Sequence, residues 1–103
     1  MRPALTATTF DLAAVRIFVQ GVELGSFIQL ADLMQCSASA ITLPLQKLER
    51  QCGQPLWQQT EGRLALTTGG EVIMAYGRRL LALNDEAFSL LHRDSDKCQL
   101  IAE

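Results

Sequence analysis

The sequence predicts a mainly α-helical domain, with a core of three short helices, then a small β-hairpin, then one long helix. Apolar residues recur at steps of three and four along most of the chain, which is the spacing of amphipathic helices. Only the stretch from Gly53 to Thr67 departs from that spacing, and the helical pattern then runs to Arg93. With 103 residues, of which 49% are hydrophobic, the chain has the size of one domain with a buried core.

The first two predicted helices are short and follow each other closely. One starts at Asp11 and stops at Gly25. The next starts at Ser26, because Ser26 and Gln29 have the spacing of a capping box, and it should run to about Met34. The first helix buries a stripe made of Leu12, Val15, Val19 and Val22, with Phe18 beside them.

The third predicted helix is capped by Ser37 and ends at Gly53, since glycine commonly follows a helix directly. Pro55 then opens an extended segment, and Glu61 and Gly62 lie between two short apolar runs, which predicts a hairpin wing. The buried stripe of the third helix consists of Ile41, Leu45, Leu48 and Cys52. The predicted core of the whole fold is Val15, Phe18, Val19, Val22, Phe27, Leu30, Ile41, Leu45, Leu48, Leu56 and Trp57.

The last predicted helix is too long to be covered by a domain of this size. Thr68 and Glu71 form a second capping box, and the helix extends to Arg93, about 23 residues or roughly 35 Å. It carries two apolar rows, so that one can pack on the domain body while the other pairs with a second copy; alternatively, both rows cover one large core. We expect a dimer through the row Ile73, Tyr76, Leu80, Leu83, Ala87 and Leu90, with Met74, Leu81 and Phe88 in the second row.

The composition argues against several classes of protein. A net charge of −2 does not fit a polybasic nucleic-acid arm or a membrane-surface anchor, so any nucleic acid must meet a local patch. The longest apolar run has five residues, far below the roughly 18 of a membrane span, and the first ten residues lack a signal-peptide pattern. We therefore expect a soluble, cytoplasmic protein with no membrane partner.

Residues that carry catalysis or bind metals are sparse and scattered. Cys36, Cys52 and Cys98 are odd in number and too widely spaced for a CxxC metal site, so we interpret them as reduced, two of them in the core. The only histidine is His92, near the end of the long helix, and no nucleophile and base can be assembled around it. The sequence predicts no enzyme, metal site or cofactor.

Two short helices joined by a tight turn and followed by a hairpin form a winged helix-turn-helix arrangement. The more specific pieces of the sequence are Phe18, the Gly25-Ser26-Phe27 triplet, Ser37, Ser39, Leu48-Glu49 with Gly53, Leu56-Trp57, and Leu66-Thr67 followed by Gly70. With these pieces, about residues 10 to 92 resemble the N-terminal domain of LysR-type transcriptional regulators. The resemblance implies that the third helix enters the major groove of operator DNA, that the wing touches the flanking backbone and that the long helix pairs two subunits.

The predicted partner is therefore double-stranded DNA, bound by a homodimer. Side chains that point away from the buried stripe of the third helix would meet the groove, where hydroxyls and amides can bond to base edges and cations to phosphates. The expected DNA-binding residues are Ser37, Ser39, Thr42, Leu43, Gln46, Lys47, Arg50 and Arg63.

The chain departs from the family pattern on that same face. Family members usually carry polar or basic side chains where this chain has Ala38, Leu43 and Pro44, and an arginine where it has Gln59. An alternative function is therefore a winged-helix module with impaired DNA reading that acts as a dimerisation or protein-interaction partner.

Pro44 and two further substitutions bear on the same surface. Pro44 lacks an amide for the carbonyl of Ala40, at a typical cost of about 3 kcal/mol, which predicts a kink in the third helix. Leu30 and Leu33 replace a small and a polar residue of the family, and we expect them to add apolar surface to the second helix.

The predicted organisation has four parts. A flexible N-terminus covers residues 1–9, the winged helix-turn-helix domain residues 10–67, the linker and dimerisation helix residues 68–93, and the start of a further linker residues 94–103. In LysR-type regulators that linker leads to an effector-binding domain, so we expect this sequence to be either a fragment of a longer chain or a naturally short chain without that domain. The resemblance implies that a small-molecule effector and any higher oligomer act through that domain.

Overall fold

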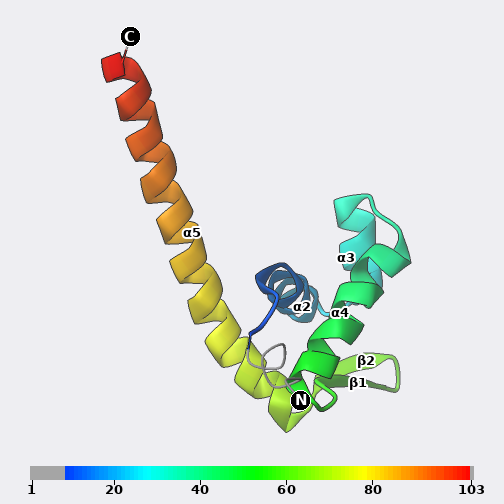
Figure 1. The fold of residues 1–103 in the computed structure, drawn as a ribbon. Coiled ribbons are helices and arrows are strands. Elements are labelled where there is room, and N and C mark those ends of the chain that lie inside the picture. The colour runs from blue at the N-terminus through cyan, green and yellow to red at the C-terminus, as the bar shows by residue number, and fades with distance from the viewer. Residues whose placement is uncertain (1–8, 103) are drawn as a thin grey trace, which may run out of the picture.

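The computed structural model describes the backbone of residues 9–102 (Figure 1). Side chains are described as far as residue 93. Most of the predicted N-terminal segment, and the side chain of Cys98, lie outside this described part. The fold class is confirmed, because three short helices precede an antiparallel hairpin and a long helix. In chain order the elements are α2 (Leu12–Leu24), α3 (Phe27–Met34), α4 (Ala38–Cys52), β1 (Trp57–Thr60), β2 (Arg63–Leu66) and α5 (Thr68–Ala102).

The short helices begin and end where the sequence predicts. The hydroxyls of Ser26 and Ser37 cap α3 and α4 by accepting hydrogen bonds from amides three residues on, at 3.1 and 3.2 Å. Gly25 and Gly53 end α2 and α4 with φ angles of +88° and +76°, which glycine adopts without steric cost. Only half of the first capping box forms, since the Ser26 amide donates to the carbonyl of Gly21 at 3.1 Å.

The start of α5 differs from the prediction by one residue. Thr67, and not Thr68, is the cap: the Thr67 hydroxyl accepts a hydrogen bond from the amide of Gly70 at 3.1 Å. Thr67 holds this position because its amide donates to the Leu56 carbonyl at 3.1 Å and its hydroxyl donates to the Pro55 carbonyl at 2.8 Å. Both carbonyls belong to the segment before the hairpin, so the local sequence around the two threonines does not show which of them is the cap.

The helix α5 also continues to Ala102, past the end predicted at Arg93. Residues 94–102 contain no glycine or proline, so nothing in the sequence stops the helix there. The segment predicted as the start of a linker is thus helical as far as Ala102. Within residues 9–102 no single helix is both long and apolar enough to cross a membrane, and the one pair that reaches this threshold together, α2 and α3, is bent by 111°.

Two buried phenylalanine rings and the partly buried ring of Trp57 pack against one another in the core. The ring centroid of Phe18 lies 6.3 Å from that of Phe27 and 6.0 Å from that of Trp57, and Phe27 and Trp57 meet edge to face at 5.1 Å. Around them the buried apolar residues are Ala14, Val15, Val19, Leu30, Ala31, Ile41, Leu45, Leu48, Leu56, Ile73, Met74 and Leu81.

Most of the predicted core is confirmed, but four residues of the predicted core and its buried stripes are less buried than expected. Val22, Trp57 and Cys52 are only partly buried, and Leu12, the first residue of α2, is exposed. The expectation that Leu30 adds exposed apolar surface is wrong: it shares one side of α3 with the buried residues Phe27 and Ala31, three positions before it and one after.

The first half of α5 packs closely on α2. Ile73, Met74 and Leu81 of α5 are buried, and the buried Gly77 lies so close to α2 that a Cβ there would come within 2.9 Å of a Val15 methyl. Ile73 therefore belongs to the core of the domain, and its placement in the dimer row is wrong. The heptad spacing alone does not show which side of the helix α2 covers.

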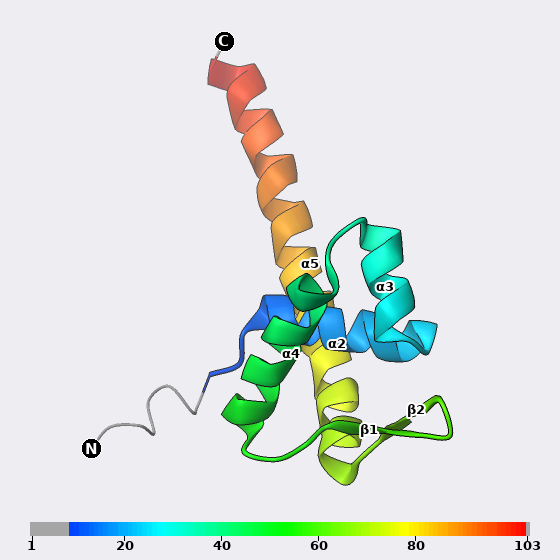
Figure 2. The same cartoon turned by 90° about the vertical axis from the view of Figure 1, so that its right-hand side faces the viewer.

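Two ion pairs fasten α5 to α2 beside this contact. Arg16 donates two hydrogen bonds to Asp85, at 2.6 and 3.3 Å, and Arg78 donates to Glu23 at 3.1 Å. The hydrogen bonds from Arg16 hold the pKa of Asp85 below its usual range, so the pair is charged at neutral pH and weakens when acid protonates the carboxylate. Beyond this region α5 projects away from the other helices (Figure 2).

The wing is a hairpin with a two-residue turn, as predicted. Trp57 pairs with Leu66 at its base and Thr60 with Arg63 at its tip. Glu61 and Gly62 have φ angles of +53° and +75°, and two left-handed residues in this position form the turn type that matches the twist of a hairpin.

Candidate nucleic-acid interface

The helix α4 presents one buried side and one open side. Ile41, Leu45 and Leu48 are buried, which fixes the rotation of the helix about its axis. The residues predicted to bind DNA, Ser37, Ser39, Thr42, Leu43, Gln46, Lys47, Arg50 and Arg63, are all exposed; Arg63 lies in β2 and the others lie in α4 or at its cap. The structure therefore leaves every one of these side chains accessible to a partner.

The hydroxyl groups at the start of α4 already have partners within the helix. The Ser37 oxygen accepts from the Ala40 amide at 3.2 Å and lies 3.1 Å from the Ser39 hydroxyl. The Thr42 hydroxyl donates to the carbonyl of Ala38 at 3.2 Å. In this conformation Thr42 can only accept a hydrogen bond, from a donor on a base edge, and it cannot donate one to a phosphate.

Lys47 faces the start of α2, where an acidic residue meets it. Its Nζ lies 3.6 Å from Oδ2 of Asp11, while Oδ1 of Asp11 caps α2 by accepting from the amides of Ala13 and Ala14 at 3.0 and 3.4 Å. The backbone amide of Asp11 also donates to Gln51 of α4 at 3.2 Å. Asp11 thus links α2 to α4 and competes with DNA phosphates for Lys47. Because Asp11 and Lys47 are far apart in the sequence, this contact could not be predicted from local patterns.

The remaining cations of the predicted interface are free of such competition. Among the described residues, neither Arg50 nor Arg63 has an acidic group within ion-pair distance. Glu49, next to Arg50, turns inward, and its carboxylate accepts from the Leu56 amide at 2.9 Å. Among the described residues, Arg50 and Arg63 are therefore the cations of the predicted interface that have no acidic partner, whereas Lys47 shares its charge with Asp11.

Pro44 does not divide α4. The helix is continuous from Ala38 to Cys52 with Pro44 inside it, and the core residues Ile41 and Leu45 on either side are both buried. Burial of the apolar stripe offsets the missing backbone hydrogen bond, so the helix continues despite the proline. The kink predicted between Ala40 and Pro44 stays a prediction.

Large apolar side chains are exposed on α3 and α4. Leu43 on the outer side of α4 is 61% exposed, and Ile28 and Leu33 on α3 are 72% and 69% exposed. The expectation for Leu33 is thus confirmed. None of the three takes part in the core cluster.

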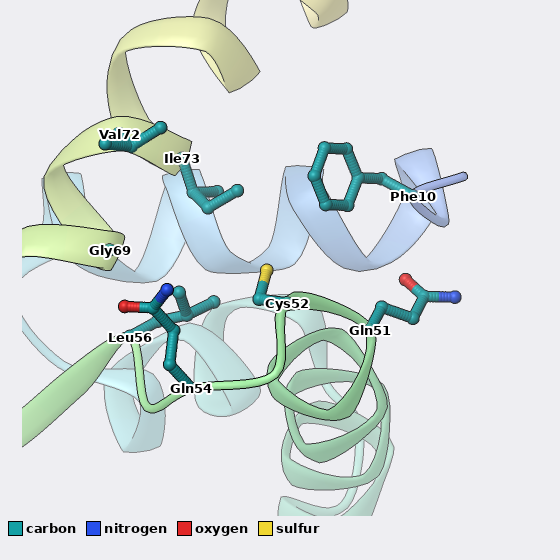
Figure 3. A pocket seen from close by; sticks show the side chains of 8 residues that line it. All are labelled: Phe10, Gln51, Cys52, Gln54, Leu56, Gly69, Val72 and Ile73. Carbon is teal, nitrogen blue, oxygen red and sulfur yellow. The ribbon is translucent and has the colours of Figure 1, made fainter. Parts of the chain in front are cut away.

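A separate pocket of about 310 Å³ lies between the end of α4 and the start of α5 (Figure 3). Its lining includes Phe10, Val72 and the half-buried Cys52, and burial together with the nearby charge of Glu49 raises the pKa of the Cys52 thiol. A raised pKa keeps this thiol protonated and unreactive. Cys36 is also only half buried. The expectation that two cysteines lie in the core is therefore wrong, because Cys36 and Cys52 lie at its margin. The pocket lining contains none of the predicted DNA-binding residues.

A tight turn between α3 and α4, the open outer side of α4 and the adjacent hairpin form a winged helix-turn-helix. Residues 12–71, more than half of the chain, match the family described as bacterial regulatory helix-turn-helix protein, lysR family. The chain belongs to the LysR family. This LysR-family domain is 39% identical over 77 residues to a probable RuBisCO transcriptional regulator of Gracilaria tenuistipitata var. liui. It is 37% identical over 82 residues to one of Cyanidioschyzon merolae.

These alignments cover 75% and 80% of the LysR-family domain but only 25% and 27% of the two regulators, so the chain spans about a quarter of the length of those relatives. Among solved structures, the BenM DNA-binding domain in complex with catB site 1 DNA is similar, with a TM-score of 0.74 and 27% identity. The match covers 82% of this chain and 93% of that one.

The long helix of this LysR-family domain leaves an apolar strip uncovered. Tyr76, Leu80, Leu83 and Leu90 of the predicted dimer row are exposed, as is Ala87, whereas Ile73 is buried against the body. From the second row, Met74 and Leu81 are buried and Phe88 is exposed. One side of α5 therefore packs on α2, and another side is exposed. The exposed side is the one that a partner helix could cover.

Proposed function

We propose that this LysR-family domain binds double-stranded operator DNA as a homodimer, with α4 in the major groove and the wing on the flanking backbone. The observation that carries the proposal is the outer face of α4, where Ser39, Gln46 and Arg50 stand exposed opposite a fully buried stripe. An α-helix with such a face fits the major groove, and these residue types bond to base edges and phosphates.

Two further observations support the parts of this proposal. The similar BenM domain was solved on DNA, and its match to this chain includes nearly all of that domain. The open strip on α5 supplies apolar surface for a second copy, which would place two α4 helices on two half-sites.

The proposed operator binding also implies where the protein acts and that it acts without catalysis. Operator binding places the protein in the bacterial cytoplasm, and it includes no catalytic step, in line with relatives that are named transcriptional regulators. Since the chain matches about a quarter of those relatives, a response to a small-molecule effector and any assembly beyond the dimer would belong to a further domain.

The direct test is binding to duplexes from a random pool, titrated with salt. We expect selective binding whose salt dependence is shallow, because few cations are free: each phosphate contact contributes a slope of about 0.9 in log K against log salt. Arg50 and Arg63 would together give a dimer a slope of about 4. Equal affinity for all duplexes would contradict operator binding.

A second candidate function is a protein-interaction module with impaired DNA reading. The exposure of Ile28, Leu33 and Leu43 favours it, since apolar groups replace hydrogen-bonding ones on α3 and α4. Under this alternative the protein dimerises but shows no selective DNA binding in the same assay.

Restoring polar chemistry on α4 should strengthen DNA binding. The double variant Leu43→Arg with Pro44→Gln adds one cation and one amide to each subunit. Both residues stand on α4, and Leu43 is exposed, so the added arginine can reach DNA. We expect higher affinity and a salt slope steeper by about two units for the dimer. Tight selective binding by the unchanged chain at physiological salt would contradict the view that these positions weaken it.

Releasing Lys47 from Asp11 should have a similar but smaller effect. In Asp11→Asn the side-chain oxygen can still cap α2, because asparagine is as good a cap as aspartate, while the charge that holds Lys47 is gone. We expect tighter DNA binding and a salt slope steeper by up to about two units for the dimer, measured by fluorescence anisotropy.

The matched control is Asp32→Asn, which removes an exposed acid of α3 that has no ion pair among the described residues. If the gain of Asp11→Asn acts through Lys47, Lys47→Gln abolishes it. A gain of equal size in Asp32→Asn, or one that survives Lys47→Gln, would show a general effect of net charge instead.

A further inference from the structure

Leu43 stands at the centre of the outer face of α4. Its side chain is 61% exposed, although leucine gains free energy from burial, and it packs into neither the core nor its margin. Ser39 precedes it by one turn and Gln46 follows it by nearly one turn, so the three share one side of the helix. A leucine therefore occupies the middle of a face whose other members can form hydrogen bonds.

The two residues next to Leu43 offer no hydrogen-bond donor to DNA, so Leu43 is the main side chain available for contact at this point of α4. The Thr42 hydroxyl donates to the carbonyl of Ala38, which turns it toward its own helix, and Pro44 has no backbone or side-chain donor. A base pair that faces this part of α4 therefore meets an apolar side chain. Only one feature of the major-groove edge matches that chemistry, namely the methyl group on C5 of thymine.

We propose that Leu43 is a specificity-determining residue that reads a pyrimidine C5-methyl group in each half-site. This inference rests on the proposed operator binding and adds which chemical group one position of the operator must present. Thymine carries that methyl group in ordinary DNA, and 5-methylcytosine carries the same group at the same place in the groove. An arginine at this position would instead favour guanine or a phosphate.

The DNA contact is favoured over a protein contact by the surroundings of Leu43. Ser39, Gln46 and Arg50 on the same face are polar or charged, so Leu43 is an isolated apolar side chain there and not the centre of a broad apolar patch. Single exposed apolar residues do not form a protein interface by themselves. One methyl group, by contrast, is a partner of the size that a single leucine can cover.

The test begins with a duplex selected from a random pool by the unchanged protein, in which each thymine is then replaced singly by uracil. Uracil differs from thymine only by the missing methyl group. We expect one position in each half-site where uracil weakens binding about fourfold, the effect of burying one group of that size. In Leu43→Ala this penalty should disappear, while Leu33→Ala, which shortens the exposed leucine of α3, should keep it.

A second arm separates the two sources of the methyl group. Cytosine at the sensitive position should bind less well than 5-methylcytosine in the unchanged protein and equally well in Leu43→Ala. Uracil penalties that are identical in the unchanged protein and in Leu43→Ala would overturn the inference while leaving operator binding intact. If no duplex is selected at all, the proposed function fails and the inference fails with it.

Discussion

Replacing Phe18 with alanine is expected to leave most of the protein unfolded or strongly destabilised. Phe18 is 0% exposed and its ring contacts those of Phe27 and Trp57, so it joins α2 to α3 and to the wing. Truncating a buried phenylalanine costs about 3 to 5 kcal/mol, because the lost transfer free energy is increased by the cavity left behind. Small domains have a total stability of only about 5 to 15 kcal/mol.

Urea denaturation followed by circular dichroism measures this loss as a change in the free energy of unfolding. The matched control is Phe88→Ala on α5, which removes the same side chain at a position where it is 56% exposed. We expect little change in the control. A loss below about 1 kcal/mol in Phe18→Ala would mean that this side of α2 is not packed as described.

The second large effect is expected on the dimer. Leu80→Glu with Leu83→Glu should convert the proposed dimer to monomers at micromolar concentration, since two carboxylates in a packed apolar seam would have to lose their hydration. Both leucines are exposed in the single chain, Leu83 at 64%, so the fold itself should tolerate the change. Sedimentation equilibrium gives the mass directly, and circular dichroism checks that the helices remain.

A matched variant adds the same charge elsewhere on α5. Ala82→Glu with Ser89→Glu places two carboxylates at exposed positions outside the predicted rows, and it should remain dimeric. If the folded Leu80 and Leu83 double variant keeps the mass of the unchanged protein, the strip on α5 is not the dimer seam. If both variants become monomers, the effect is one of total charge.

The parts of the fold that follow from local chemistry are the parts that the sequence predicts well. Ser37 can cap α4 and Gly53 can end it whatever the rest of the chain does, because each acts on amides and carbonyls within a few residues. The choice between Thr67 and Thr68 is different. Both are good caps, and only the pairing of Thr67 with the backbone before β1 decides between them.

The candidate site divides in the same way. The outer face of α4 follows from helical spacing, since burial of Ile41 and Leu45 determines which residues point outward. The ion pair between Asp11 and Lys47 and the burial of Ile73 depend on how α2 lies against α4 and α5. Helix packing of this kind is a long-range property, and a single sequence contains no direct signal for it.

The long helix α5 is packed on the domain and is not a flexible linker. It contacts α2 closely at Gly77 and through the ion pairs Arg16–Asp85 and Arg78–Glu23. A flexible connection would let the domain tumble independently of whatever holds its far end. Here the first half of α5 packs directly on α2, and α2 in turn packs directly on α4. A change in the direction of the projecting part of α5 is therefore expected to reorient α4 together with the rest of the domain.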